Sequence, residues 1–220
     1  MGGSYTNQTK PDEEHSMRGV SLKILTLALT FILTAMAGLA LAGSPTEAVK
    51  GTVDEVIRLL SNPALKDPSQ KSRILRQVRQ VVDRRFDYEE MAKRTLPNWN
   101  RLNASQRREF VTLFSELLAT SYADKLAKYS GEKVAYQGDR MDGDVAEVDT
   151  VLLRRNDRIP INYRLINKSD WAVYDVVIEG VSLVNNYRSQ FTRVIGESSY
   201  EDLVRRLQNK VEEQRRAGSL

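Results

Sequence analysis

Two carboxylates in one predicted strand are the residues best placed to do acid–base chemistry. Asp175 and Glu179 lie four positions apart in the strand-like run 171–179, so an extended backbone places them on the same face. A single Asp in a twisted sheet could act as a general base. The alternative is an ordinary ion pair with Arg164 or Arg188 on the solvent-facing side of the sheet. The surrounding face is mixed and offers no paired acid, which favours the ion pair.

Other groups that enzymes commonly use are scarce in this chain. Its 220 residues include 33 Lys and Arg, 29 Asp and Glu, one His and no Cys, for a net charge of +4. Without Cys there are no disulfides, thiolate nucleophiles or Cys-ligated metals. The one histidine, His15, lies in a segment that we expect to be removed. We therefore expect no catalytic residue, no cofactor and no metal, and binding is favoured over catalysis.

A leader sequence is indicated near the N-terminus. Arg18 and Lys23 precede an uncharged run of 19 residues, 24–42, which ends in Ala-Leu-Ala. A basic start, an apolar stretch and small residues in that order are typical of a signal peptide, and we expect cleavage after Ala42. A transmembrane anchor is the alternative, because a membrane span needs roughly 20 residues. Translation could start at Met1 or at Met17, which opens the basic segment.

Periodicity predicts one α+β domain in residues 43–220. Helices are predicted from Ser44 to Asn62, after Pro68, from Phe86 to the break at Pro97, and from Asn103 through Leu126. The period then changes to two, with strand-like runs at 133–136, 145–153, 159–165 and 171–179, and helical spacing returns after Gly180. We expect a twisted four-stranded antiparallel sheet that cups the long helix, with one face covered and one face wet.

The segment 171–191, WAVYDVVIEGVSLVNNYRSQF, is the most specific pattern in the chain. It resembles the signature of the MlaC-type, or toluene-tolerance (Ttg2-type), periplasmic phospholipid-binding proteins, in which the final strand runs through an EGVSL turn into a helix bearing NYRSQF. The resemblance extends over most of residues 46–207. It departs at Leu96-Pro97, where the family usually has Leu-Gly before the Trp.

The resemblance implies a fold and a function together. The fold is an NTF2-like cone in which the sheet and helices surround an apolar cavity. The function is that of a periplasmic phospholipid shuttle in a Mla-type ABC transport system that maintains outer-membrane lipid asymmetry in a Gram-negative cell. The implied partners are phospholipid, an inner-membrane MCE-domain protein of the ABC transporter and an outer-membrane lipoprotein–porin complex. We expect a monomer that binds no nucleic acid.

The predicted cavity lining follows from the faces of the elements. The long helix should contribute one apolar stripe, the sheet its covered face, and the strand-to-helix turn its apolar side chains. The residues are Phe110, Phe114, Leu117, Tyr122, Val148, Val151, Ile161, Tyr163, Val173, Val177, Val181, Leu183 and Tyr187. For each position ordinary core packing is the alternative, because an apolar stripe looks the same against side chains or lipid.

Two other functions are compatible with the sequence. An isomerase-like enzyme on a similar cone would use Asp175 as its base. A basic adaptor would use the Arg-rich helix after Pro68 to contact nucleic acid or a membrane surface. Export and the lack of interleaved aromatic and basic residues count against nucleic acid.

Overall fold

The computed structural model describes residues 1–2 and 43–217, apart from the side chain of residue 124. Residues 3–42 of the predicted leader lie outside the described residues, so cleavage after Ala42 stays a prediction. The assignment of residues 43–220 to a single domain also stays a prediction. Among the described helices, none is both long and apolar enough to cross a membrane. The elements run in the order α2 (Pro45–Leu60), η2 (Pro63–Lys66), α3 (Pro68–Arg85), α4 (Tyr88–Thr95), η3 (Trp99–Arg101), α5 (Ala104–Ala127), β1 (Lys133–Asp142), β2 (Val145–Arg154), β3 (Asp157–Asn167), β4 (Trp171–Ile178), β5 (Val181–Ser182), α6 (Leu183–Glu197) and α7 (Tyr200–Arg216).

Capping side chains explain where the helices start. The Ser44 hydroxyl accepts a hydrogen bond from the Glu47 N–H at 3.1 Å, with Pro45 in the first helical position of α2. Helix α5 begins at a capping box: the Asn103 side chain accepts from the Gln106 N–H, and the Gln106 side chain accepts from the Asn103 N–H, both at 3.0 Å. The helices predicted at these positions are confirmed.

The sheet is an antiparallel meander of five strands in the order β1-β2-β3-β4-β5, not of four. The fifth strand has two residues, Val181 and Ser182, which pair with Ile178 and Val177 of β4. Glu179 and Gly180 between them have φ angles of 51° and 80°. Positive φ at both central residues is the geometry of a type I′ hairpin turn, whose twist matches that of the strands. The EGVSL sequence is therefore a tight hairpin that leads directly into α6.

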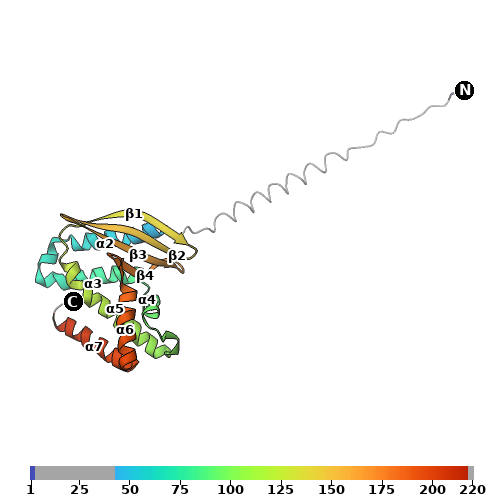
Figure 1. Ribbon diagram of the computed structural model, residues 1–220. Helices are drawn as coiled ribbons and strands as arrows, with labels where there is room; N and C mark the ends of the chain where they lie inside the picture. The colour runs from blue at the N-terminus through green and yellow to red at the C-terminus, as the bar shows by residue number, and fades with distance from the viewer. Residues whose placement is uncertain (3–42, 218–220) are drawn as a thin grey trace. The chain divides into compact units, whose positions relative to one another are not determined.

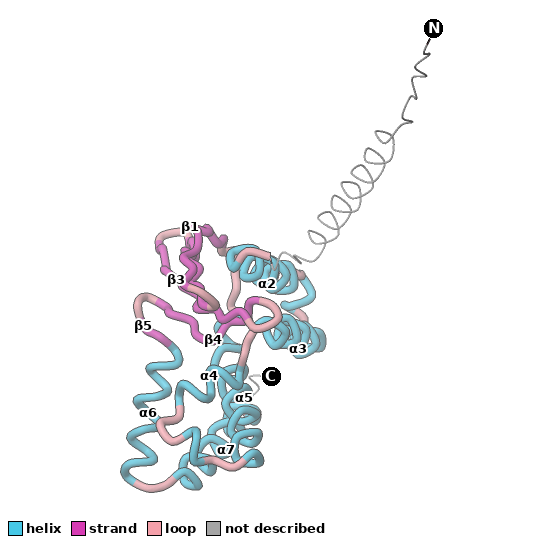
Figure 2. The backbone as a smooth tube through the Cα atoms, turned by 90° about the vertical axis from the view of Figure 1, so that its right-hand side faces the viewer, coloured by secondary structure: helices cyan, strands magenta, loops and turns pink. Residues whose placement is uncertain are grey.

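The helices cover one face of the sheet and extend past it (Figure 1). Helix α2 packs on β1 and β2, whereas α3, α4 and α6 contact β4. In the view of Figure 2, α6 and α7 lie below the strands. This mixed arrangement of helices and an antiparallel sheet confirms the α+β class, and the NTF2-like cone stays a prediction.

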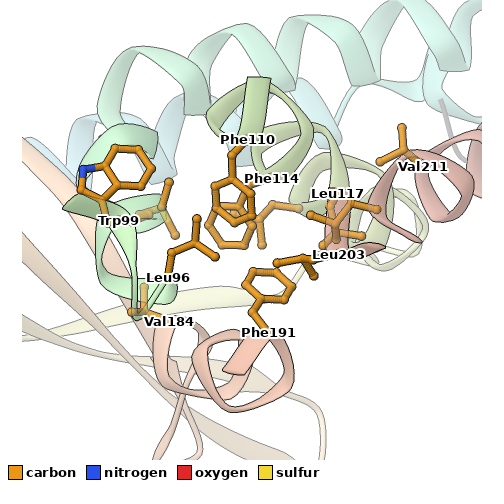
Figure 3. Close-up of a cluster of buried hydrophobic side chains, with 13 residues drawn as sticks. Leu96, Trp99, Phe110, Phe114, Leu117, Val184, Phe191, Leu203 and Val211 are labelled. Carbon is orange, nitrogen blue, oxygen red and sulfur yellow. The ribbon is translucent and has the colours of Figure 1, made fainter. Parts of the chain in front are cut away.

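The largest apolar core of the described residues lies among α4, α5, α6 and α7, and its side chains are drawn in Figure 3. Phe110 and Phe114 of α5 pack edge-on against Phe191 of α6, with ring centroids 5.6 and 5.9 Å apart. Edge-to-face pairs at such distances stabilise a core beyond the area that they bury. A second core joins α2 to the sheet, and a third joins α2 to α3.

Candidate functional site

An apolar cavity of about 250 Å³ lies between helices α3, α4 and α5 and strands β3 and β4. Its wall contains aliphatic and aromatic side chains and one charged residue, Arg79. The lining residues are Leu75, Val78, Arg79, Val82, Phe86, Tyr88, Met91, Leu118, Ala119, Tyr122, Ala123, Leu126, Ile161, Tyr163, Val176, Ile178 and Leu183. A concave apolar site with few polar groups is typical of a ligand pocket.

Two helices build the curved half of this wall. Residues 75, 78, 79 and 82 of α3 recur at intervals of three and four, so they lie on one face of the helix. On α5 the wall is formed by Leu118, Tyr122 and Leu126, one turn apart, with Ala119 and Ala123 beside them. The two alanines leave room next to the longer side chains, and this open strip of α5 contributes to the cavity.

The flat half of the wall consists of two cross-strand pairs. Ile161 pairs with Ile178, and Tyr163 pairs with Val176, across the β3–β4 ladder. Directly opposed residues of an antiparallel pair project from the same face of the sheet. These four side chains therefore form one continuous apolar surface toward α3 and α5.

A β-bulge decides which residues of β4 face the cavity. Arg164 pairs with Asp175, but the next residue of β3, Leu165, pairs with Val173, which leaves Tyr174 as an extra residue in β4. Before the bulge Val173 faces the core, and after it Val176 and Ile178 take that side. In a regular strand every second residue shares a face, so Val173 and Val177 are both predicted to face the cavity. Because of the bulge, Val177 instead pairs with Asn162 on the opposite face of the sheet.

The tyrosines in the wall contribute hydroxyl groups but no charge at neutral pH. Desolvation by burial raises the pKa of Tyr163 to about 12. Desolvation also raises the pKa of Tyr122, with a smaller contribution from the neighbouring Tyr187. The pKa of Tyr88 is raised as well, by desolvation first and by the negative charge of Asp83 second. All three phenols therefore stay protonated, and the cavity surface stays weakly polar.

Four of the predicted lining residues lie in this wall: Tyr122, Ile161, Tyr163 and Leu183. The other nine lie elsewhere. Phe110, Phe114, Leu117 and Tyr187 belong to the core among α4–α7, Val148 and Val173 to the core between α2 and the sheet, Val151 and Val177 are buried outside the cavity wall, and Val181 is 58% exposed in the β4–β5 hairpin.

Most of the predicted α5 residues lie outside the cavity wall because this helix is apolar on more than one side. The side with Phe110, Phe114 and Leu117 packs against α6 and α7, where Phe114 also meets Tyr187 at 5.3 Å between ring centroids. Leu118 and Tyr122 border this core and also line the cavity. The sequence predicts that a single stripe of α5, Phe110, Phe114, Leu117 and Tyr122, lines the cavity, although these residues span more than one face of a helix.

Sequence reasoning missed the contribution of α3 and α4 to the wall. Leu75, Val78 and Val82 lie in the helix that is predicted after Pro68, and Met91 lies in the helix predicted from Phe86, but neither helix was assigned to a cavity wall. The alternation of Leu118, Tyr122 and Leu126 with two alanines was the signal that could have revealed the second side of α5. No sequence signal identifies α3 as the opposite wall, because that depends on tertiary packing.

Asp175 is buried, with 2% of its surface exposed, and does not line the cavity. Its carboxylate accepts hydrogen bonds from the Ser182 hydroxyl at 2.6 Å, the Val184 N–H at 3.0 Å and the Arg164 guanidinium at 3.2 Å. The expected ion pair with Arg164 is present, but the carboxylate of Asp175 is buried, whereas a solvent-exposed pair was expected. Arg188 instead donates to a backbone carbonyl, that of Arg94, at 3.4 Å.

Through these contacts Asp175 joins β4 to the start of α6, and we call this its bracing role. Ser182, which donates to Asp175, is also the N-cap of α6 and accepts from the Asn185 N–H at 3.0 Å. A carboxylate at a helix N-terminus is favoured both by the free N–H groups and by the helix dipole. With its oxygens occupied and turned from the cavity, Asp175 has no access to a ligand held there.

In residues 1–2 and 43–217, no three or more His, Cys, Asp or Glu side chains form a group that could hold a metal ion.

Comparisons with known proteins give consistent matches. A family model described as MlaC protein matches residues 50–209. The intermembrane phospholipid transport system binding protein MlaC of Haemophilus influenzae is 28% identical over 113 residues, 48% of this chain and 53% of that protein, so the match spans about half of the relative. The solved structure of a phospholipid-binding protein from Ralstonia solanacearum, in complex with a phospholipid, is 25% identical, with a TM-score of 0.69 over 78% of this chain and 99% of that one.

Proposed function

The chain belongs to the MlaC protein family, as the resemblance of residues 171–191 predicted, and we propose that it binds a phospholipid and carries it between membranes. The observation that carries this proposal is the apolar cavity between α3, α4, α5 and the β3–β4 ladder. We assign the acyl chains to this cavity. The solved Ralstonia relative, which holds a phospholipid, supports the assignment.

The energetics of acyl chains require such a cavity. Exposing an acyl chain to water costs about 0.8 kcal/mol per CH₂, so two chains of ordinary length would cost on the order of 20 kcal/mol. A carrier must therefore shield nearly all of both chains. Because a bilayer shields them equally well, transfer into and out of the carrier can be nearly balanced. Direction then comes from the donor and acceptor complexes, and the carrier itself needs no energy source.

The size of the cavity adds a requirement. At about 250 Å³ it is slightly smaller than the roughly 300–1,000 Å³ of most ligand pockets. Binding of a lipid with two long chains therefore requires the walls to move apart. We propose that α3 and α5 move apart, because the side chains that they direct into the cavity are mostly aliphatic and the Arg79–Ser115 hydrogen bond of 3.3 Å is one contact that must break.

Membership of the family supports a proposal for the wider role. We propose that the protein is exported to the periplasm through residues 1–42 and acts there as a monomeric shuttle. It would exchange lipid with an inner-membrane MCE-domain protein of an ABC transporter and with an outer-membrane lipoprotein–porin complex, and so maintain outer-membrane asymmetry. The role of the Haemophilus relative, a binding protein of an intermembrane phospholipid transport system, supports this proposal. An enzymatic role for Asp175 has no supporting contact in the cavity.

Lipid extraction from protein purified without detergent tests the proposal. We expect co-purifying phospholipid in near-stoichiometric amount by mass spectrometry, and uptake of lipid from liposomes after delipidation. Only trace lipid, together with no uptake from liposomes, would contradict a lipid-carrying function.

A further inference from the structure

Among the residues whose side chains the structure describes, Arg79 is the one charged residue in the cavity wall, and the apolar walls alone do not explain its place there. It lies on α3, in the same helical face as Val78 and Val82. Its side chain is 25% exposed, and that of its ion-pair partner Asp83 is 39% exposed. The pair therefore lies where the apolar cavity meets solvent. A charge at such a boundary must be paired or hydrated, because burying it alone is costly.

The guanidinium of Arg79 is only partly engaged. Its Nε donates to both carboxylate oxygens of Asp83, at 2.7 and 2.9 Å, and its Nη2 donates to the Ser115 hydroxyl of α5 at 3.3 Å. Arginine has five N–H donors, and among the described residues no hydrogen bond from the Nη1 group of Arg79 is formed. Donors remain for an acceptor that arrives with a ligand.

Tyr88 holds the acidic side of this cluster in place. Its hydroxyl donates to Asp83 Oδ1 at 2.8 Å, and its ring centroid is 6.0 Å from the Arg79 guanidinium carbon. Tyr88 also lines the cavity. Because its pKa is raised by desolvation and by Asp83, the phenol stays protonated and continues to donate. Asp83 thus neutralises Arg79 and fixes its orientation without occupying all of its donors.

We propose that Arg79 binds the phosphate group of a phospholipid whose acyl chains occupy the cavity. This inference rests on the proposed function, because it requires the chains to lie against the apolar wall. A phosphate attached to such chains must come to the boundary between cavity and solvent, where Arg79 lies. Guanidinium groups bind phosphate oxygens through charge-assisted hydrogen bonds, which are stronger than neutral ones.

Substitution of Asp83 distinguishes phosphate binding by Arg79 from a purely structural role of the Arg79–Asp83 pair. Asp83 competes with the phosphate for the positive charge of Arg79, so Asp83→Asn should strengthen phosphate binding while Arg79→Gln weakens it. If the pair served only to hold α3 against its neighbours, both substitutions would act in the same direction. Arg76→Gln is the matched control, because Arg76 is exposed on the same helix and lies outside the cavity wall.

The test compares two lipids that share acyl chains and differ in the phosphate. The full chain and its variants are incubated with vesicles containing phosphatidylethanolamine and diacylglycerol, re-isolated, and their lipid is measured by mass spectrometry. We expect the ratio of phospholipid to diacylglycerol to fall on the order of tenfold in Arg79→Gln, to rise in Asp83→Asn, and to stay unchanged in Arg76→Gln. Urea unfolding of each variant confirms that it is folded.

The outcomes separate this inference from the function on which it rests. Wild-type protein that takes up neither lipid contradicts the proposed function itself. Uptake of both lipids, with the same ratio in wild type and Arg79→Gln, overturns the phosphate assignment alone. An unchanged or lower ratio in Asp83→Asn overturns it too, even if Arg79→Gln does not fold. Delipidated wild type that binds inorganic phosphate through Arg79, with the same lipid ratio in wild type and Arg79→Gln, would assign Arg79 to free phosphate and overturn the lipid assignment.

Discussion

The carboxylate of Asp175 in β4 accepts a hydrogen bond from the backbone N–H of Val184, the second residue of α6, at 3.0 Å. The bond joins two elements that flank the β4–β5 hairpin. Together with the Ser182 hydroxyl, which also donates to Asp175, it fixes the direction in which α6 leaves the sheet. The core between α5 and α6 depends on that direction, because Phe191 of α6 packs on Phe110 and Phe114.

Asp175→Asn should therefore lower stability and leave lipid binding per folded molecule unchanged. The amide keeps one acceptor oxygen, but it brings an NH₂ group to a buried position surrounded by donors, Ser182, Val184 and Arg164. We expect a loss of about 1–3 kcal/mol in the free energy of unfolding, measured with urea. Asp54→Asn is the control, since Asp54 is half exposed and pairs with Lys50 along one helix. Loss of lipid from a fully folded Asp175→Asn would contradict the bracing role.

Ile178→Glu should remove lipid from a folded protein. Ile178 lies in the cavity wall opposite Ile161, so the new carboxylate would face acyl chains. Without a partner it must protonate or exclude the lipid, and the desolvation of a polar group costs several kcal/mol. We expect bound lipid to fall by on the order of tenfold or more, measured by extraction and mass spectrometry. Met141→Glu, at a position that is 65% exposed, should retain the wild-type amount.

Sequence patterns predicted the elements of this fold because their signals are local. Ser44 and Asn103 mark helix starts by hydrogen bonds within three residues of themselves. The period of two in the run 159–165 likewise predicts that Ile161 and Tyr163 lie on the covered face of the sheet, and both side chains do lie there, in the cavity wall.

The cavity lining was harder to predict because it depends on non-local pairing. One extra residue, Tyr174, changes which side of β4 faces inward, and nothing in the run of β-branched residues around it indicates a bulge. Similarly, Phe114 and Leu118 are one turn apart and both belong to the core among α4–α7, yet Leu118 also lines the cavity and Phe114 does not. Only the positions of α3 and α6 distinguish these roles.

Filling the cavity from α5 should exclude lipid without adding charge. Ala119 lies in the wall between longer side chains, so Ala119→Phe would occupy much of a space of about 250 Å³. We expect a fall of several-fold in bound lipid, and a change in unfolding free energy of about 1–3 kcal/mol or less, because the new ring enters an existing space. Ala104→Phe adds the same ring at an exposed position near the start of α5 and should change neither quantity. Wild-type lipid content in folded Ala119→Phe would place the acyl chains elsewhere.

The outer face of the sheet should contribute a pH-dependent part of the stability through Glu147. Hydrogen bonding to Arg164, at 2.9 Å, lowers the pKa of Glu147, with further contributions from Asn162 and the charge of Arg140. A carboxyl whose pKa is lower in the folded than in the unfolded state stabilises the fold above its unfolded value of about 4.3, and this contribution disappears as pH falls through the folded value.

Glu147→Gln should therefore be less stable than wild type at pH 7, and the two should converge as the pH falls below about 4. Because Glu147 is partly exposed, we expect a difference of only about 1 kcal/mol at pH 7. Urea midpoints at a series of pH values measure it. Glu213→Gln serves as the comparison, since Glu213 is 70% exposed and pairs with Lys210 within one helix, so its effect should be smaller at pH 7. A stability difference for Glu147→Gln that stays constant down to pH 3 would show that its charge is not what stabilises the sheet.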